Sequence, residues 1–241
     1  MLLEDDKGQV VDYGVVLVPQ DQYRIDDVWH VAGLRASGSN CVIIEDLFVP
    51  EHRFSSLGHT LNGAYMAEHP NSPAYRAAVG SLLAMVLVGP QLGFGRAALE
   101  IVRAKAGSKA IAYTTFLKQS DSVGFMLQVA EAATQIDTAH LHAYRAADDV
   151  EHYAQLGIMP DLLTRARIRA DAATALTNIN RALNALLFAN GSSAFAESSP
   201  LQRIWRDSNI GARHAVMLPQ IGLEVYGRAL LGVEEQITPI L

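Results

Sequence analysis

The feature that most constrains the fold of this chain is a series of long stretches rich in Ala and Leu that fills its last two thirds. Apolar residues recur there with helical spacing and β-branched runs are few, which predicts helices over 75–106, 120–153, 161–189 and 200–230. Stop and start signals fall between these helices: Gly107-Ser108, Gly157 with Pro160, Asn190–Ser193, and Ser199-Pro200. Four long helices in succession predict a four-helix bundle.

The stretch between Arg76 and Arg96 holds nineteen uncharged residues, a length that would suit a membrane span. It also contains four glycines, Pro90 and Gln91, and its most apolar part runs only from Leu82 to Val88. We therefore predict the central helix of the bundle, buried on most sides and kinked at Pro90, and no membrane partner.

Residues 8–54 differ from the helical part, because they are rich in β-branched and aromatic residues and are interrupted by Gly and Pro. This pattern predicts short strands over 9–19, 23–31 and 40–50. Residues 55–74 are polar and without periodicity, which predicts a long loop. The expected fold class is thus α+β and mostly α, with a partial β-domain over 1–54, a loop over 55–74 and the bundle over 75–241.

Three strands are close to the minimum for a stable sheet, and the chain opens directly on strand-like sequence. We therefore expect a chain that lacks the N-terminal part of a longer protein.

Composition excludes several classes of function. Half of the 241 residues are hydrophobic and 18% are charged, so the chain can bury a sizeable core. A net charge of −6 without a basic cluster argues against nucleic-acid binding. The single Cys41 cannot form an internal disulfide or a Cys-based zinc site. The first residues lack the pattern of a signal peptide, so a cytoplasmic location is expected.

No pattern of metal ligands or of an activated nucleophile stands out. His140 and His142 lie two residues apart on a predicted helix and therefore point about 200° apart, so they cannot share one metal ion. The sequence has no Gly-x-Ser-x-Gly elbow, no phosphate-binding P-loop and no Gly-x-Gly-x-x-Gly motif. We expect no metal.

The most informative residues follow position 189. Small polar residues at 190–193 end a predicted helix and can offer hydrogen-bond donors to an anion. Four polar residues then follow at spacings of three to four on one predicted helix: Arg203, Arg206, Asn209 and Arg213. His214 comes next. Taken alone, these residues favour ordinary salt bridges of a bundle and a buried imidazole.

Three ordered motifs resemble those of the acyl-CoA dehydrogenase superfamily. They are Trp29 with the Gly33–Ser39 loop and Phe48-Val49-Pro50, then Asn190–Phe195 with Arg206-Asp207, and last Gly227–Gly232. The resemblance covers essentially the whole chain and implies an acyl-CoA dehydrogenase-like fold. The commonest dehydrogenases of this superfamily carry a Glu base eight positions after Arg-Asp. That position is Ala215 here, beside His214. The sequence is thus more similar to the flavin-dependent monooxygenase branch, the oxygenase components of two-component phenol and hydroxyphenylacetate hydroxylases.

For this branch, the resemblance implies hydroxylation of a small phenolic substrate through a C4a-hydroperoxyflavin, with O₂ as co-substrate. Reduced FMN or FAD would come from a separate NAD(P)H-dependent reductase, and the assembly would be a homotetramer. The implied catalytic residue is His214. The implied flavin contacts are Asn190, Gly191, Ser192, Ser193, Arg103, Lys109, Ser37 and Ser39, and the implied substrate contacts are Tyr65, Asn209 and Arg213. The alternatives are an acyl-CoA dehydrogenase with a relocated base and a truncated, non-catalytic fragment that oligomerises through its bundle.

Overall fold

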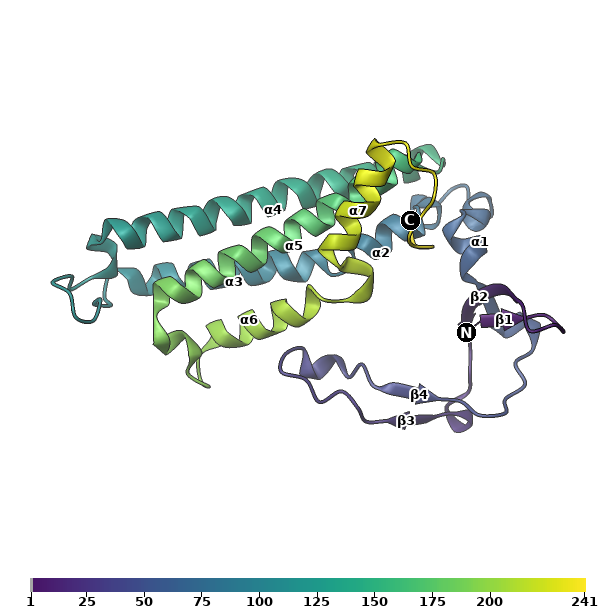
Figure 1. Ribbon diagram of the computed structural model, residues 1–241, viewed down its shortest axis with the longest axis horizontal. Coiled ribbons are helices and arrows are strands. Elements are labelled where there is room, and N and C mark those ends of the chain that lie inside the picture. Colours follow the sequence, from purple (N-terminus) through teal and green to yellow (C-terminus); the bar gives the residue numbers. More distant parts are fainter. Residues whose placement is uncertain (1) are drawn as a thin grey trace.

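The computed structural model describes residues 2–241, and most of them form a helical bundle (Figure 1). Its helices are α2 (Val79–Met85), α3 (Val88–Ala106), α4 (Val123–Leu156), α5 (Leu162–Asn190), α6 (Pro200–Gly211) and α7 (Pro219–Leu230). Helix α5 is the central element, because α2, α3, α4, α6 and α7 all pack against it. The large apolar side chains on its inner face are fully buried, namely Ile168, Leu176, Ile179, Leu183 and Leu186. The predicted mostly helical fold is thus confirmed.

The ends of the long helices follow local sequence signals. Gly157 ends α4 with a φ of 68°, a left-handed conformation that glycine adopts without strain. The Asp161 carboxylate caps α5 by accepting a hydrogen bond from the Thr164 amide at 2.7 Å. Gly191 ends α5 with a φ of 72°, and Pro200 occupies the first turn of α6. These boundaries lie within a few residues of the predicted ones.

The predicted helix over 75–106 is interrupted, because α2 ends at Met85 and α3 begins at Val88, two residues before Pro90. The helical stretch Val79–Ala106 contains an eighteen-residue window with a mean hydropathy of 1.5 and is, within 2–241, the one such stretch long and apolar enough to cross a membrane. In the structure α3 packs on α4, α5 and α6. The expectation of burial on most sides is wrong, since α3 buries a single face, formed by Val88, Gln91, Gly95, Ala98 and Val102.

The predicted helix over 200–230 is two helices. Helix α6 ends at Gly211, and α7 begins at Pro219 after a short 3₁₀ turn, Ala215–Met217. Proline lacks the N–H of a helix interior and disfavours helical backbone at the preceding residue, and Leu218 has φ −53° and ψ 117°. The prediction that Arg213 and His214 lie on one helix with Arg203 is therefore wrong, because both residues lie in the turn between α6 and α7.

Five short strands form the N-terminal part. β1 (Leu2–Glu4), β2 (Val10–Val16) and β5 (Phe54–Ser56) make an antiparallel sheet in the order β1-β2-β5. β3 (Arg24–Asp26) and β4 (Cys41–Ile43) make a separate antiparallel hairpin. The three predicted strands correspond to β2, β3 and β4 but were predicted too long, and β1 and β5 were missed. The segment 55–74 is not one loop, since it contains α1 (Leu57–Leu61) and two 3₁₀ turns, Ala64–Ala67 and Pro73–Arg76.

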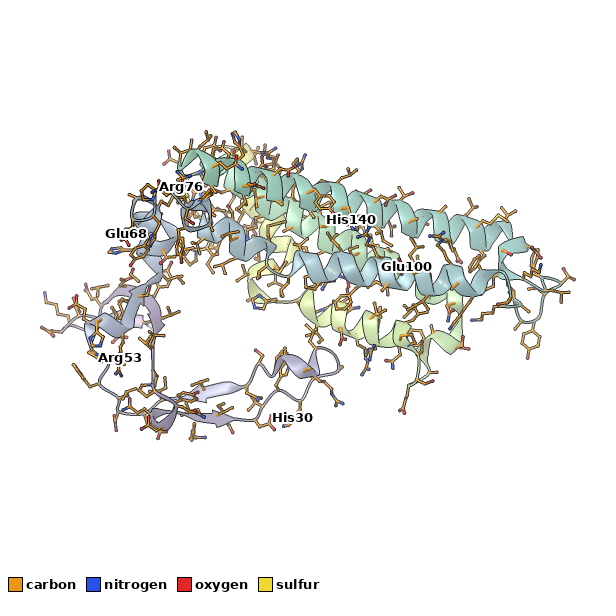
Figure 2. The ribbon with its side chains drawn as sticks, turned by 180° about the vertical axis from the view of Figure 1, so that it is seen from behind. His30, Arg53, Glu68, Arg76, Glu100 and His140 are labelled. Carbon is orange, nitrogen blue, oxygen red and sulfur yellow. The ribbon has the colours of Figure 1, made fainter. Side chains whose placement is uncertain are left out.

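The β segments stand away from most of the bundle (Figure 1). In Figure 2, Arg53 and Glu68 lie at the end of the molecule where the sheet and α1 join the helices. His30 lies where the β3–β4 hairpin approaches the helices again. Apolar residues of β2 stay open to solvent, with Val11 64% and Val15 62% exposed. The N-terminal part thus contributes little to the core.

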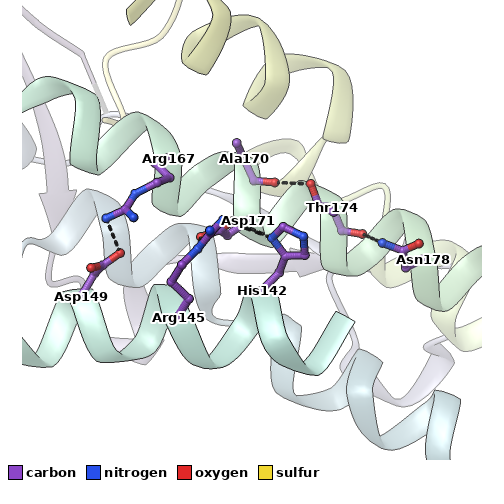
Figure 3. A network of polar contacts seen from close by, with 8 residues as sticks. All are labelled: His142, Arg145, Asp149, Arg167, Ala170, Asp171, Thr174 and Asn178. Atoms are coloured by element: carbon purple, nitrogen blue, oxygen red, sulfur yellow. Dashed lines mark hydrogen bonds and ion pairs between the residues drawn. The ribbon is translucent and has the colours of Figure 1, made fainter. Parts of the chain in front are cut away.

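A polar network joins α4 to α5 in the middle of the bundle (Figure 3). The Asp171 carboxylate on α5 is 2% exposed and contacts two residues of α4. It lies 2.7 Å from Nδ1 of His142 and accepts a hydrogen bond from Nε of Arg145 at 2.9 Å. Nearby, Arg167 of α5 forms an ion pair with Asp149 of α4 at 2.8 Å. Because these contacts are directional, they help to fix the register of two helices whose interface is rich in small Ala side chains.

Candidate functional site

A cavity of about 620 Å³ lies where the loop after α3 meets the end of α5, and we call it the Ser193 pocket. The Lys109 ammonium donates to Oγ of Ser193 at 2.9 Å and to the carbonyl oxygen of Asn190. Gly191 and Ser192 also line this pocket. Five of the residues predicted to bind flavin, Lys109 and the segment 190–193, are therefore brought together although more than 80 positions separate the lysine from the segment.

The polar groups of the Ser193 pocket are poorly satisfied within the chain. Gln119 donates to the Ala189 carbonyl at 2.9 Å, but its buried Oε1 and the buried Oδ1 of Asn190 have no hydrogen-bond partner in the described part of the chain. Burial, and secondly the nearby Lys105 charge, lower the pKa of Lys109. No carboxylate lines the described pocket. A desolvated cation beside hydroxyl and amide groups is suited to an anion.

A second cavity of about 600 Å³ lies between α5, α6 and α7, and we call it the Arg213 pocket. Asn209 and Arg213, both predicted to bind substrate, line it together with Arg181. Nη1 of Arg213 donates to Oδ1 of Asn209 at 2.9 Å and to the Asn209 carbonyl at 2.7 Å. Among residues 2–241, no carboxylate lines this pocket or forms an ion pair with either arginine. The pocket therefore also favours an anionic group.

A smaller cavity of about 210 Å³ lies between these two pockets on the exposed side of α5. It shares Asn184 with the Arg213 pocket, and Phe188, Gly191 and Ser192 with the Ser193 pocket. Phe188 is 81% exposed, and Nε1 of Trp205 donates to Oδ1 of Asn184 at 2.9 Å. The three cavities form one continuous line along α5, with Lys109 at one end and Arg213 at the other. Such a line can hold an extended ligand that combines anionic groups with a flat apolar part.

His214 is exposed and caps the 3₁₀ turn that follows α6. Its Nδ1 accepts a hydrogen bond from the Val216 amide at 3.4 Å, which leaves Nε2 open to solvent. The simpler interpretation of a buried imidazole is therefore wrong. His214 lines none of the three cavities, but it directly follows Arg213, which lines the Arg213 pocket. An imidazole can act as a general acid or base.

Arg206 and Asp207 hold the hairpin loop against α6 and do not form salt bridges within the bundle. Nη1 of Arg206 donates to the Ala32 carbonyl at 2.8 Å, and Asp207 accepts from the Leu34 amide at 2.6 Å. Gly33 lies between these contacts and is buried. The β3–β4 loop is thereby placed beside α6, near the turn after this helix in which Arg213 and His214 lie.

We expect Gly33→Ala to detach this loop. The added Cβ would lie 2.4 Å from the Arg206 carbonyl oxygen and 2.8 Å from the Asp207 nitrogen, so rigid backbone would have to move. Overpacking of this kind costs about 1–3 kcal/mol. The Leu34 amide should then exchange its hydrogen faster. Gly93→Ala, whose Cβ would meet nothing within 4 Å, is the matched control, and equal exchange in the two variants would contradict the docking role.

The remaining predicted site residues lie outside the line of cavities. Ser37 and Ser39 are exposed at the tip of the β3–β4 loop, where the Ser37 hydroxyl donates to the Leu34 carbonyl at 2.8 Å and shapes the turn. Arg103 lines a separate hollow between α3 and α4, and Tyr65 lies in the 3₁₀ turn Ala64–Ala67 and lines none of the three cavities.

Sequence reasoning missed Gln119, Asn184 and Arg181 as residues that line these cavities. The first lies in a loop and the other two on the exposed face of α5, and no local motif marks them. Within residues 2–241 no group of three or more His, Cys, Asp or Glu side chains could hold a metal ion.

Comparison with known proteins gives a consistent result. Residues 85–219 match the family model "Acyl-CoA dehydrogenase, C-terminal domain". The chain is 32% identical to the oxygenase subunit HsaA of a flavin-dependent monooxygenase from Rhodococcus jostii (strain RHA1), over 94% of this chain and 59% of the relative. It is 30% identical to the oxygenase component of an FADH(2)-dependent resorcinol hydroxylase from Rhizobium sp. (strain MTP-10005), over 95% of this chain and 58% of the relative.

Among solved structures, XiaF from Streptomyces sp. in complex with FADH2 and glycerol matches with a TM-score of 0.92 and 36% identity, over 99% of this chain and 60% of that chain. The chain thus spans about three fifths of the length of these relatives. The family match covers more than half of the chain and includes α3, α4, α5 and α6. On this evidence the chain belongs to the acyl-CoA dehydrogenase family.

Proposed function

We propose that this chain is the flavin- and substrate-binding part of the oxygenase component of a two-component flavin-dependent monooxygenase, which hydroxylates a small phenolic compound. The observation that carries the proposal is the line of cavities along α5, with Lys109 and Ser193 at one end and Arg213 beside His214 at the other. The similarity to two oxygenase components and to a structure solved with FADH2 supports it.

The Ser193 pocket fits a flavin phosphate. Lys109 would donate to a phosphate oxygen, and the Ser192 and Ser193 hydroxyls would donate beside it. The unpartnered oxygens of Asn190 and Gln119 would accept from ribityl or ribose hydroxyl groups. When bound, a reduced flavin supplies the two electrons that activate O₂, so that one oxygen atom enters the substrate ring and the other leaves as water.

His214 is the proposed catalytic residue. Its exposed Nε2 can give a proton to, or take one from, the groups that react at the flavin and the substrate. The hydrogen bond from the Val216 amide occupies Nδ1, so Nε2 is the ring nitrogen proposed to exchange the proton.

Arg213 and Asn209 are the proposed substrate-binding residues. The Arg213 guanidinium faces no carboxylate in the described residues and can therefore stabilise a phenolate oxygen. A phenolate ring is more electron-rich than the phenol, which favours its attack on an electrophilic oxygen atom. Asn209 holds the guanidinium in place through two hydrogen bonds.

We further propose that a separate NAD(P)H-dependent reductase supplies the reduced flavin. The protein would assemble as a homotetramer and lie in the cytoplasm. The reductase is proposed because the chain is similar to oxygenase components of flavin-dependent monooxygenases. In a tetramer the exposed residues Gly191, Ser192 and Ser193 would face a neighbouring subunit.

We expect Lys109→Gln to weaken the binding of FMN about tenfold or more, since a charged hydrogen bond to phosphate contributes about 1.5–3 kcal/mol. Riboflavin lacks the phosphate, so its affinity should not change. Lys118→Gln, which removes an exposed lysine outside the pocket, is the matched control. Isothermal titration measures both ligands, and an equal loss of FMN and riboflavin binding would contradict the phosphate contact.

The pH dependence of FMN binding follows from the same lysine. The cationic form binds the phosphate, and burial lowers the pKa of Lys109 below the ordinary value of a lysine. The affinity should therefore fall as the pH rises through this lowered pKa. Lys109→Arg, which stays protonated, should keep its affinity over the same pH range, whereas a parallel decline in both proteins would assign the effect to another group.

A further inference from the structure

A buried arginine links the His214 turn to the last described residues of the chain. After α7, residues 233–241 fold back across the bundle, and Leu241 is buried between α5 and α7 against Ala166 and Val225. The backbone of Leu241 lies so close to Gly80 of α2 that a Cβ there would be 2.8 Å from its carbonyl oxygen. The end of this segment is therefore packed against the bundle, while residues 233–237 stay exposed.

Arg169 of α5 is 5% exposed and donates to two segments at once. Its Nη1 donates to the Ile240 carbonyl, and its Nη2 donates to the Val216 carbonyl at 3.3 Å. Within residues 2–241, no carboxylate forms an ion pair with Arg169, and its buried Nε has no partner. The buried cation is thus compensated by the two backbone carbonyls.

The Val216 carbonyl belongs to the turn that carries His214. The Val216 amide donates to Nδ1 of His214 at 3.4 Å, and the Met217 amide donates to the His214 carbonyl at 2.8 Å. The His214 amide also donates to the Gly211 carbonyl at 3.2 Å. The guanidinium thus contacts the residue whose amide holds the His214 imidazole. Arg165, one turn earlier on α5, donates to the Leu241 carbonyl at 2.9 Å, and within residues 2–241 it forms no hydrogen bond with the turn.

We propose that Arg169 is a positioning residue, which clamps residues 214–217 to α5 and to the 233–241 segment and thereby sets the orientation of the His214 imidazole. The importance of this clamp for catalysis rests on the proposed role of His214. The hydrogen bonds of Arg169 to the two segments are independent of that role. Arginine suits the task because its planar fork reaches two acceptors in fixed directions, which a lysine ammonium cannot do.

Hydrogen exchange of the complete 241-residue chain, followed by mass spectrometry, tests the clamp without any need for activity. In Arg169→Met, the peptide that covers 212–218 should exchange about tenfold faster, the factor that the loss of one charged hydrogen bond supports. In the control Arg165→Met, exchange should rise in 236–241 and stay unchanged in 212–218. Equal exchange of 212–218 in the two variants would overturn the proposal.

Two further measurements keep the test decisive. Arg169→Lys retains the buried charge but reaches one carbonyl, so it should fold and show an intermediate acceleration in 212–218. The NMR chemical shifts of the His214 imidazole, compared at one pH, should change in both Arg169 variants and not in Arg165→Met. Unchanged imidazole shifts in the Arg169 variants would contradict the positioning role. If the exchange and the shifts behave as expected but the chain does not hydroxylate a phenol, only the proposed function is contradicted.

Discussion

Replacement of His214 by alanine should lower the rate of hydroxylation by about 10²–10⁴-fold, the range over which a positioned acid or base accelerates a reaction. The affinity for FMN should stay within about twofold, because the proposed phosphate contacts lie at the other end of α5. Hydrogen peroxide should accumulate in place of product, since proton control is lost while the flavin still reacts with O₂. Product and peroxide are measured together in one assay with chemically reduced FMN.

His152→Ala is the matched control for this prediction. His152 is also an exposed histidine, but it lies on α4, whereas His214 directly follows Arg213 of the Arg213 pocket. Its substitution should leave the product yield unchanged. A His214 variant with the full rate and yield of product would remove His214 from the proposed mechanism.

Replacement of Asp171 by alanine should lower the free energy of unfolding by about 3 kcal/mol, at the lower end of the cost of removing one partner from a buried ion pair. The carboxylate is 2% exposed and contacts both His142 and Arg145, so its loss leaves two donors of α4 without their acceptor. We expect the loss of unfolding free energy to lie at this lower end because the Arg145 side chain is 49% exposed and can form hydrogen bonds with water. Urea denaturation followed by circular dichroism measures the effect.

The neighbouring ion pair supplies the control. Asp149 and Arg167 join the same two helices, but their side chains are 22% and 32% exposed. Asp149→Ala should therefore cost less than about 1 kcal/mol. If the two variants lost the same free energy of unfolding, the burial of Asp171 would not explain its effect on stability, and the two ion pairs would contribute equally.

The helical bundle could be predicted from the sequence because single residues determine where several of its helices begin and end. Gly157, Gly191 and Pro200 each end or begin a helix through their own backbone preferences, without help from distant residues. The division between α6 and α7 was missed because Pro219 falls inside a stretch whose apolar spacing continues past it. The strands β1 and β5 were missed because three residues are too short to show a period.

The site could be predicted in part. The 190–193 segment and His214 were found through motifs that resemble those of a family, and the structure brings Lys109 to that segment. The contact of Leu34 with Asp207 joins residues 173 positions apart, and nothing local in either segment indicates it. The same holds for Arg169 and Val216, whose contact depends on the fold of the turn after α6.

The most direct test of the central claim follows the fate of isotopically labelled O₂. The chain is incubated with reduced FMN, a phenol and the labelled gas, and the product is analysed by mass spectrometry. The account predicts that one labelled oxygen atom enters the ring of the product, and that this incorporation is lost in the His214→Ala variant. Formation of hydrogen peroxide alone, or anaerobic reduction of bound oxidised flavin by an acyl-CoA, would contradict it.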